Sequence, residues 1–388
     1  MLNNIANLID KHYEEMVDIR RHLHQYPELS FHEEKTAKYI QSYYDNLHIP
    51  YEKNVGGYGV VATLKGTKPG KTIAFRADFD ALPIQDEKDV AYKSTVPGVM
   101  HACGHDGHTA TLLVLAKVLK EVQSELAGTI IFVHQHAEEL APGGAKPLIE
   151  TGILKDVDYI YGTHLWSTTP FGHIETRPGV LMAGADRFEI NIIGQGGHGA
   201  YPHETKDAIV IASQVVSQLQ QIISRRLDPL QTAVVTVGQI QAGTAFNVIA
   251  DQAKLVGTVR YLDPSIQDAI KDEIDNVIKG ICLTHGADYE FTYAKGYPPL
   301  INNDDEANHI LNVAHEVSDV KMVTENKPQM GAEDFAYYLH DIPGAFFFTG
   351  AQLEETYPHH HPKFDFNEKA MPIAAKVFAQ IYWSKQDW

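Results

Sequence analysis

The apolar positions along the chain predict helices that alternate with short buried strands. Apolar residues spaced three or four positions apart indicate helices over the ranges 5–23, 33–47 and 109–126. Short, largely apolar stretches indicate strands over 58–64, 72–75, 128–133, 157–162 and 345–348. The continuous run 128–133 is typical of a strand buried on both faces. This alternation is typical of an α/β domain built on an open sheet.

The middle of the chain has a different order of elements. The pattern there predicts strands and helices in the order β-α-β-β-α-β over 187–193, 207–224, 232–240, 255–261, 264–282 and 288–294. That order is the ferredoxin-like one. We therefore expect residues 181–296 to form an independent α/β unit, inserted between the two parts, 1–180 and 297–388, of a larger domain.

Polar side chains follow the predicted strands of the larger domain. They are Asp78, Asp80, Glu138, Glu139, His164 and the histidine run 359–361. In open α/β sheets, ligands bind beyond the carboxyl ends of the strands. We therefore expect these side chains to converge on one site.

The stretch 100–108, MHACGHDGH, places a thiol, a carboxylate and several imidazoles within nine residues. Such side chains bind divalent metals of intermediate softness. Taken alone, the stretch fits a buried cysteine beside surface histidines equally well. The chain has 21 histidines but only two cysteines, Cys103 and Cys282, so we expect no disulfide framework.

The charge and the N-terminal sequence narrow the classes of protein. A net charge of -18 leaves no basic stripe that could neutralise phosphates, which argues against nucleic-acid binding. Residues 1–21 lack the apolar segment of a signal peptide, and no apolar run approaches the ~20 residues of a membrane span. We expect a soluble cytoplasmic protein without membrane contact, in which Cys103 stays a thiol or thiolate.

These residue types suffice for a hydrolytic site with two metal ions. Such a site needs a bridging anion, terminal His and carboxylate ligands, and a base for water. Cys103 can bridge as a thiolate, with His105, His164 and one histidine of 359–361 as terminal ligands.

Glu138 and Glu139 are neighbours and are expected to point in different directions. One would then bind metal, and the other would be the general base that deprotonates water and protonates the leaving amine. A solvated acidic pair is the alternative. Asp80 would orient a ligand imidazole, or else cap a helix or turn.

Five motifs, in family order, resemble those of the M20 metallopeptidases. They are RADFDALP (76–83), HACGHD (101–106), AEE (137–139), GHGAYPH (197–203) and GAEDF (331–335). The resemblance covers nearly the whole chain. Within the family, the chain is most similar to the branch of aminoacylases, hippurate hydrolases and auxin-conjugate amidohydrolases. The loop 331–335 has no assigned role beyond lining the site.

The resemblance implies a zinc-peptidase-like catalytic domain with a mixed sheet flanked by helices. It also implies a satellite domain that often mediates dimerisation, and thus a homodimer or homotetramer. Two divalent ions per subunit would be held by Cys103, His105, Glu139, His164 and His360, the last lying two residues before the motif's proline.

The same resemblance assigns roles to the remaining candidates. Glu138 matches the catalytic base, and His198 matches a histidine that contacts the oxyanion, often in a neighbouring subunit's site. Asn247 and Arg260 match satellite residues that hold a substrate carboxylate. Without the resemblance, His198 would be read as a solvated loop residue, Asn247 as a turn residue and Arg260 as a surface ion-pair partner.

Two features depart from the family pattern. His359, His360 and His361 are consecutive, so position alone leaves open which of them binds metal. His136 stands where the branch usually has proline. It supplies either a further ligand or, in the interpretation we prefer, a surface imidazole.

The leading hypothesis is a metal-dependent amidohydrolase that cleaves N-acyl amino acids or small peptides, with Glu138 as the base for a metal-activated water. A peptidase whose substrates have a free amino terminus would share this chemistry. A cysteine-nucleophile hydrolase would use Cys103 but leave Glu138, Glu139 and His164 without a task. A non-enzymatic His-rich metal-binding protein would bind metal without turnover. Zinc, manganese, cobalt and nickel all remain candidates.

Overall fold

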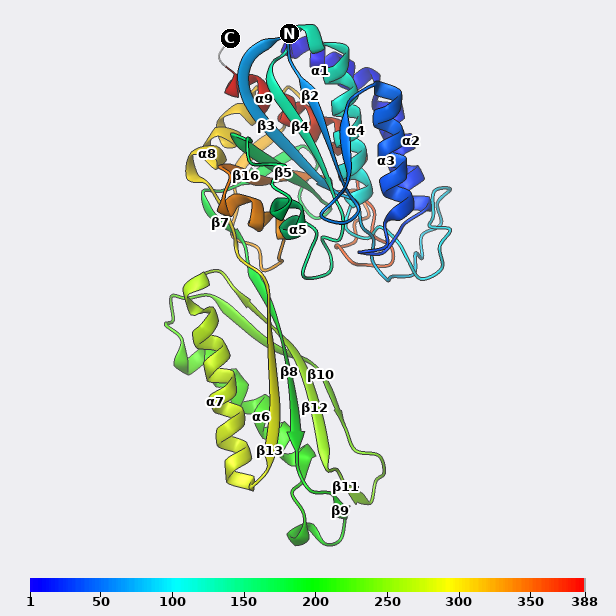
Figure 1. Ribbon diagram of the computed structural model, residues 1–388. Coiled ribbons are helices and arrows are strands. Elements are labelled where there is room, and N and C mark those ends of the chain that lie inside the picture. The colour runs from blue at the N-terminus through cyan, green and yellow to red at the C-terminus, as the bar shows by residue number, and fades with distance from the viewer. Residues whose placement is uncertain (387–388) are drawn as a thin grey trace. The chain divides into compact units, whose positions relative to one another are not determined.

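The computed structural model describes residues 1–386, which form two compact units (Figure 1). Unit 1 comprises Met1–Leu181, Ile301–Lys327 and residues 334–386, and unit 2 comprises Met182–Leu300 and Pro328–Glu333. Each unit is built around its own cluster of buried apolar side chains.

Unit 1 contains an eight-stranded mixed sheet in the order β1-β2-β4-β3-β5-β16-β6-β15. Its strands are β1 (Tyr51–Val55), β2 (Gly59–Lys65), β3 (Lys68–Asp78), β4 (Ala127–Gln135), β5 (Tyr159–Trp166), β6 (His173–Thr176), β15 (Met322–Glu325) and β16 (Gly344–Gly350). Strands β4, β3, β5 and β16 run parallel to one another. All seven residues of β16 are buried, as its uninterrupted apolar run predicts. The expected mixed α/β sheet is confirmed.

Helices cover both faces of this sheet (Figure 1). They are α1 (Leu2–Lys11), α2 (Tyr13–Gln25), α3 (Glu34–Leu47), α4 (His105–Glu121), α5 (Ala145–Glu150), α8 (Asp304–Val313) and α9 (Ala370–Lys385). Phe346 packs against Phe335 of the 3-10 helix Asp334–His340, whereas Phe347 packs against Phe378 of α9. Because successive strand residues point to opposite faces, these two helices cover opposite faces.

The structure corrects several predicted boundaries. The single helix expected over 5–23 is divided into α1 and α2 at His12, whose amide bonds to two carbonyls in a tightened turn. The apolar spacing continues through this junction, so the pattern carries no signal for it. Helix α4 begins at His105, before its first apolar residue, and β5 extends far enough to include His164.

Unit 2 contains a four-stranded antiparallel sheet in the order β10-β12-β8-β13. Its strands are β8 (Gly184–Ile193), β10 (Ala233–Ala242), β12 (Gln252–Tyr261) and β13 (Asp288–Tyr297), and its helices are α6 (Ala208–Gln221) and α7 (Gln267–His285). The β-α-β-β-α-β order is the one predicted. Alternate residues of β8 and β12 are buried under α6 and α7, so one sheet face forms the core of this unit.

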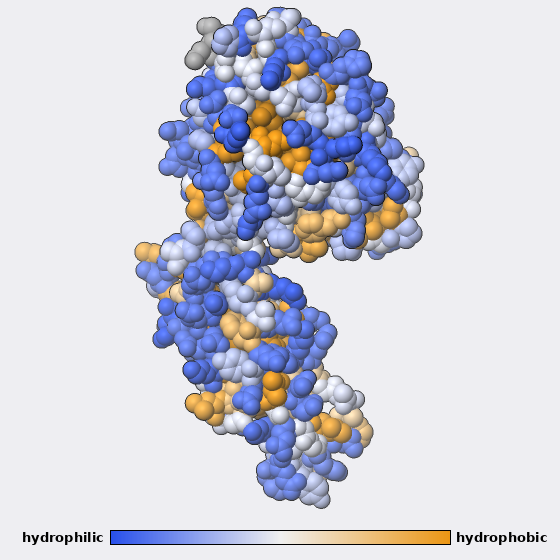
Figure 2. All heavy atoms as spheres, viewed as in Figure 1, coloured by the Kyte–Doolittle hydropathy of each residue, from blue (hydrophilic) through white to orange (hydrophobic). Residues whose placement is uncertain are grey.

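Two pairs of short strands complete the topology. Strand β9 (Gly197–His198) pairs with β11 (Val248–Ile249), and β7 (Gly179–Met182) pairs with β14 (Leu300–Asn302). Polar side chains cover most of the visible face, with small separate hydrophobic areas (Figure 2). Within residues 1–386, no helix combines the length and apolar character needed to cross a bilayer.

Candidate metal centre and active site

The polar side chains that follow the strands of unit 1 meet at one edge of its sheet. Asp78 ends β3 opposite Gln135 of β4, and His164 of β5 lies opposite Phe348 of β16. Parallel strands end at a common edge, so the loops after them share that edge. The loop that follows β16 returns there with the histidine run 359–361.

The Cys103 loop is held in place from two sides. Gly104 has φ +98°, a conformation that glycine adopts readily, and it turns the chain from Cys103 into the first residue of α4, His105. The amide of His360 donates to the Ala102 carbonyl at 2.8 Å. That bond fixes the C-terminal loop against the loop that carries Cys103.

Hydrogen bonds decide which ring nitrogens can bind a metal. His164 donates from Nδ1 to the Leu165 carbonyl at 3.0 Å, which leaves the Nε2 lone pair near Cys103 Sγ, 3.3 Å away. His359 has the opposite arrangement, because its Nε2 accepts from the Ser167 amide at 3.2 Å. Burial, followed by the neighbouring imidazoles, lowers the pKa of His359 to about 3. Its single proton therefore lies on Nδ1, the nitrogen that faces Cys103, and blocks that lone pair.

His360 has an available nitrogen. Its Nε2 lies 3.3 Å from Oε1 of Glu139, and this contact raises the pKa of the imidazole. His360 adopts φ +65°, an uncommon backbone conformation that directs the chain back over the Cys103 loop. The hydrogen bonding thus favours His360 over His359 as a ligand, a choice that spacing alone left open.

Asp80 fixes the ring of His105. Its Oδ1 lies 3.1 Å from His105 Nδ1, while its Oδ2 accepts from Ser30 Oγ at 2.7 Å and from the Glu139 amide at 2.9 Å. The Nε2 atom of His105 then faces Asp78, Glu138 and Glu139 at 3.8–3.9 Å. Burial alone would lower the pKa of His105, but the carboxylates, Asp78 first, raise it to about 10. The cluster therefore attracts positive charge to Nε2.

The geometry fits a divalent metal. His105 Nε2 is buried, has no hydrogen-bond partner among the described residues, and lies 3.8 Å from Glu139 Oε1. Tetrahedral ligands at zinc bond lengths are separated by about 3.3–3.8 Å. The Cys103–His164 and Glu139–His360 separations, both 3.3 Å, agree with that spacing. A buried polar atom without a partner is costly unless an ion or water meets it.

His108 lies in the same cluster but has no nitrogen left for a metal. Its Nδ1 lies 2.6 Å from Asp78 Oδ1, and its Nε2 accepts from the Leu165 amide at 2.9 Å. His108 therefore joins the ends of β3 and β5. Its role is to hold the two strand ends in register with α4.

His136 is not the surface imidazole that we preferred on sequence grounds. It is 2% exposed and packs edge-on against Phe31 and Tyr58. A side chain at Gly57 would collide with its ring, so the space around it is tightly filled. His136 also lies outside the groups of metal-binding side chains found among the described residues. Packing by residues far away in sequence buries it.

The sequence motifs gave no role to a buried ionic network beneath the site. Arg76 donates to Gln135 at 2.9 Å, to Asp78 at 2.6 Å and to Asp334 of the 331–335 motif at 2.8 Å. Burial alone would raise the pKa of Asp78, but His105 and Arg76 hold it well below its ordinary value. The network keeps Asp78 ionised. Arg76 and Asp334 stand in the quoted motifs, yet only the fold pairs them.

Glu33 also lies close to the site, and the sequence did not single it out. It is fully buried, and its Oε1 accepts from the Ala137 amide at 2.8 Å. Burial and the charge of Asp80 raise its pKa to about 8. Its only sequence signal is its place as the first residue of the predicted helix 33–47, where a glutamate is expected to be exposed.

This shift predicts a pH effect on stability. Between about pH 4.5 and 8 the folded protein keeps a proton on Glu33 that the unfolded chain has released, so this group's contribution falls as pH rises. Relative to Glu33→Gln, the wild type should lose about 1.4 kcal/mol of unfolding free energy per pH unit in that window. Thermal midpoints of both proteins, chelated, at pH 5 to 8 would test this. Parallel curves would contradict it.

The three satellite candidates lie at two places in unit 2. His198 of β9 and Asn247 are close together, because the Gly199 amide donates to the Asn247 carbonyl at 2.9 Å and His198 pairs with Val248. Arg260 is half-buried near the other end of β12. It lies eight residues, or about 26 Å of strand, beyond the β12 end that adjoins β9.

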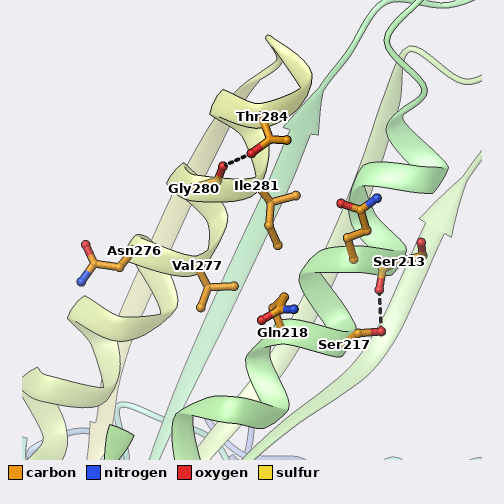
Figure 3. A pocket seen from close by; sticks show the side chains of 9 residues that line it. Ser213, Ser217, Gln218, Asn276, Val277, Gly280, Ile281 and Thr284 are labelled. Atoms are coloured by element: carbon orange, nitrogen blue, oxygen red, sulfur yellow. Dashed lines mark hydrogen bonds between the residues drawn. The ribbon is translucent and has the colours of Figure 1, made fainter. Parts of the chain in front are cut away.

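A groove between α6 and α7 holds a cavity of about 510 Å³ (Figure 3). Its lining is Ser213, Gln214, Ser217, Gln218, Asn276, Val277, Gly280, Ile281 and Thr284. None of these side chains is acidic, basic or a thiol. The groove therefore lacks the groups that hydrolysis requires.

Comparison with known proteins identifies the family of this chain. The sequence profile of peptidase family M20/M25/M40 matches residues 74–384. The chain belongs to peptidase family M20. An N-acyl-L-amino acid amidohydrolase from Geobacillus stearothermophilus is 47% identical over 302 residues, 78% of this chain and 81% of its own.

Other relatives of this M20 chain support the same family assignment. YhaA of Bacillus subtilis (strain 168) is 59% identical over 378 residues, 97% of this chain and 96% of its own. The structure of the Bacillus subtilis YXEP protein, described as a dinuclear metal binding peptidase from the M20 family, superposes with a TM-score of 0.81 at 36% identity. That match covers 96% of this chain and 98% of YXEP. Relatives carry both amidohydrolase and carboxypeptidase names, so this M20 chain is a hydrolase of amide or peptide bonds.

Proposed function

We propose that this M20 chain is a metal-dependent amidohydrolase that releases the amino acid from N-acyl amino acids. One observation carries the proposal: His105 Nε2 is buried without a hydrogen bond among the described residues, and it faces Glu139 Oε1 at 3.8 Å and the Glu138 carboxylate at 3.9 Å. Carboxylates that gather around this nitrogen suit a cation bound in place of its proton, and a further carboxylate beside them suits a base.

Two metal ions would share Cys103. Its sulfur belongs to one group with His164 and His359 and to another with Glu139 and His360, while His105 and Glu139 form a further group with Glu138. In the first group we assign the metal to His164, because the Ser167 amide occupies Nε2 of His359. Cys103 would then be the ligand that both ions have in common. Thiolate and imidazoles favour zinc, cobalt or nickel, and the carboxylates accommodate manganese. When bound, such ions polarise a carbonyl and lower the pKa of water.

The protein side chains would move the protons and hold the geometry. Glu138, 6% exposed, takes a proton from water and returns it to the departing nitrogen. Asp80 keeps Nδ1 of His105 engaged, so that only Nε2 is presented to a metal. His198 would donate to the oxygen on which negative charge develops.

A second copy of the chain would complete each site. His198 and Asn247 lie about 26 Å of strand away from Arg260, whereas an extended dipeptide-sized substrate spans only about 7 Å. One substrate therefore cannot meet both ends of the same unit 2. We propose a homodimer or homotetramer, supported by the exposed outer half of edge strand β10. A monomer in sedimentation analysis of the active enzyme would contradict this proposal.

The two adjacent histidines are expected to behave differently. Replacing His360 by Ala removes the nitrogen beside Glu139, and we expect loss of about one metal per subunit and of most activity. His359→Ala removes a nitrogen already occupied by the Ser167 amide, so metal content should stay at the wild-type level. Metal analysis after gel filtration makes the comparison. Loss of metal in His359→Ala alone would reverse the assignment.

The function itself is tested by amine release from N-acetyl, N-benzoyl and N-indoleacetyl amino acids and from dipeptides. We expect the metal-loaded protein to hydrolyse at least one N-acyl series faster than the dipeptides. Preference for dipeptides would establish the peptidase alternative instead. Bound metal without any turnover would leave the metal-binding alternative. We place the enzyme in the cytoplasm, where both free cysteines stay reduced.

A further inference from the structure

The loop between α2 and α3 contacts both halves of the candidate site. The Glu28 carbonyl accepts from the Ala81 amide at 2.8 Å, and Ser30 Oγ donates to Asp80 at 2.7 Å. At its other end, Glu33 Oε1 accepts from the Ala137 amide at 2.8 Å. The loop thus touches the chain after β3 and the chain after β4.

Ala137 adopts an unusual backbone conformation next to the general base. Its φ is +53°, in the left-handed region that alanine rarely occupies because its Cβ crowds the backbone. The residue is completely buried and directly precedes Glu138. Such a conformation persists only when surrounding contacts impose it. The bond from its amide to Glu33 is one of those contacts.

The Glu33 carboxyl meets the Ala137 amide inside the protein. It is fully buried, and its Oε2 has no hydrogen-bond partner among the described residues. Burial and the charge of Asp80 raise its pKa to about 8, which keeps it uncharged at neutral pH. An uncharged acceptor can hold the amide without placing another negative charge beside the metal-binding carboxylates.

We propose that Glu33 is a positioning residue for the general base: its carboxyl holds the Ala137 amide and thereby fixes the backbone turn that directs Glu138 into the site. This inference rests on the proposed function. Glu33 itself contacts no substrate and binds no metal. Its effect on catalysis passes entirely through the direction of the Glu138 side chain.

Two isosteric variants test the proposal. Glu33→Met fills the same volume but offers no acceptor, so we expect kcat to fall on the order of 10²-fold, with KM and bound metal unchanged within about threefold. Glu33→Gln keeps an acceptor oxygen and should retain kcat within about threefold. Glu28→Ala is the matched control. It removes a cap on Thr36 from the same loop without touching Ala137, and should lower stability but not kcat.

The outcomes distinguish failure of this positioning role from failure of the proposed amidohydrolase function. Any of three results would overturn the positioning role. Glu33→Met could keep the wild-type kcat, the Gln and Met variants could be impaired equally, or Glu28→Ala could lose as much kcat as Glu33→Met. If the wild type itself shows no turnover, the proposed function fails instead. The crystal structure of Glu33→Met then decides the positioning role: Ala137 leaving positive φ supports it, and an unchanged turn refutes it. Should Glu33→Met not fold, kcat and the φ of Ala137 are measured in Glu33→Ala instead.

Discussion

Glu138→Gln is expected to lower kcat by about 10³- to 10⁴-fold while both metals stay bound. The substitution preserves the volume and one oxygen of a side chain that is 6% exposed, so packing changes little. Glutamine cannot accept the proton of water or return one to the leaving nitrogen. The expected loss therefore falls on kcat, with KM nearly unchanged.

Glu139→Gln is the matched comparison. Glu139 Oε1 lies within 3.8 Å of both His105 and His360, so this variant should lose metal as well as activity. Steady-state kinetics with parallel metal analysis distinguishes a lost base from a lost ligand. Near-normal turnover by Glu138→Gln would show that Glu138 is not the base. Metal loss in Glu138→Gln equal to that in Glu139→Gln would show that Glu138 is a metal ligand as well.

Removal of metal is expected to have the second large effect. Chelation should reduce turnover at least 10³-fold and lower the thermal midpoint, because ions that bind only the folded state stabilise it by about 4 kcal/mol at a thousandfold excess over Kd. Without cations, the carboxylates of Asp78, Glu138 and Glu139 all lie within 3.9 Å of His105 Nε2 and repel one another. Re-addition of a single metal type at a time should restore activity and identify the preferred ion.

Chelation also distinguishes metal-dependent hydrolysis from the cysteine-nucleophile alternative. Burial raises the pKa of the Cys103 thiol, and the charges of Glu139, Glu138 and Asp78 raise it further. A nucleophilic cysteine needs the opposite shift. We therefore expect chelated protein to be inactive and Cys103→Ala to bind less metal. Full turnover after chelation, abolished by alkylation of Cys103, would establish the alternative.

Local patterns in the sequence determined the secondary structure and the chemical types of the site. A buried strand such as β16 and an amphipathic helix such as α3 each leave a periodic signal within about ten residues. Because parallel strands end at one edge, polar residues that follow them predicted a shared site. The candidates Asp78, Glu138 and His164 could thus be named before any contact was known.

Only the tertiary structure decided how each of these residues is used. The Ser167 amide occupies His359, Phe31 and Tyr58 bury His136, and Glu33 holds the turn before Glu138. These contacts join residues from 78 to 192 positions apart, and the partners have no shared periodicity. A hydrogen bond fixes a tautomer or a turn through distance and direction in space, which composition and spacing along the chain do not encode.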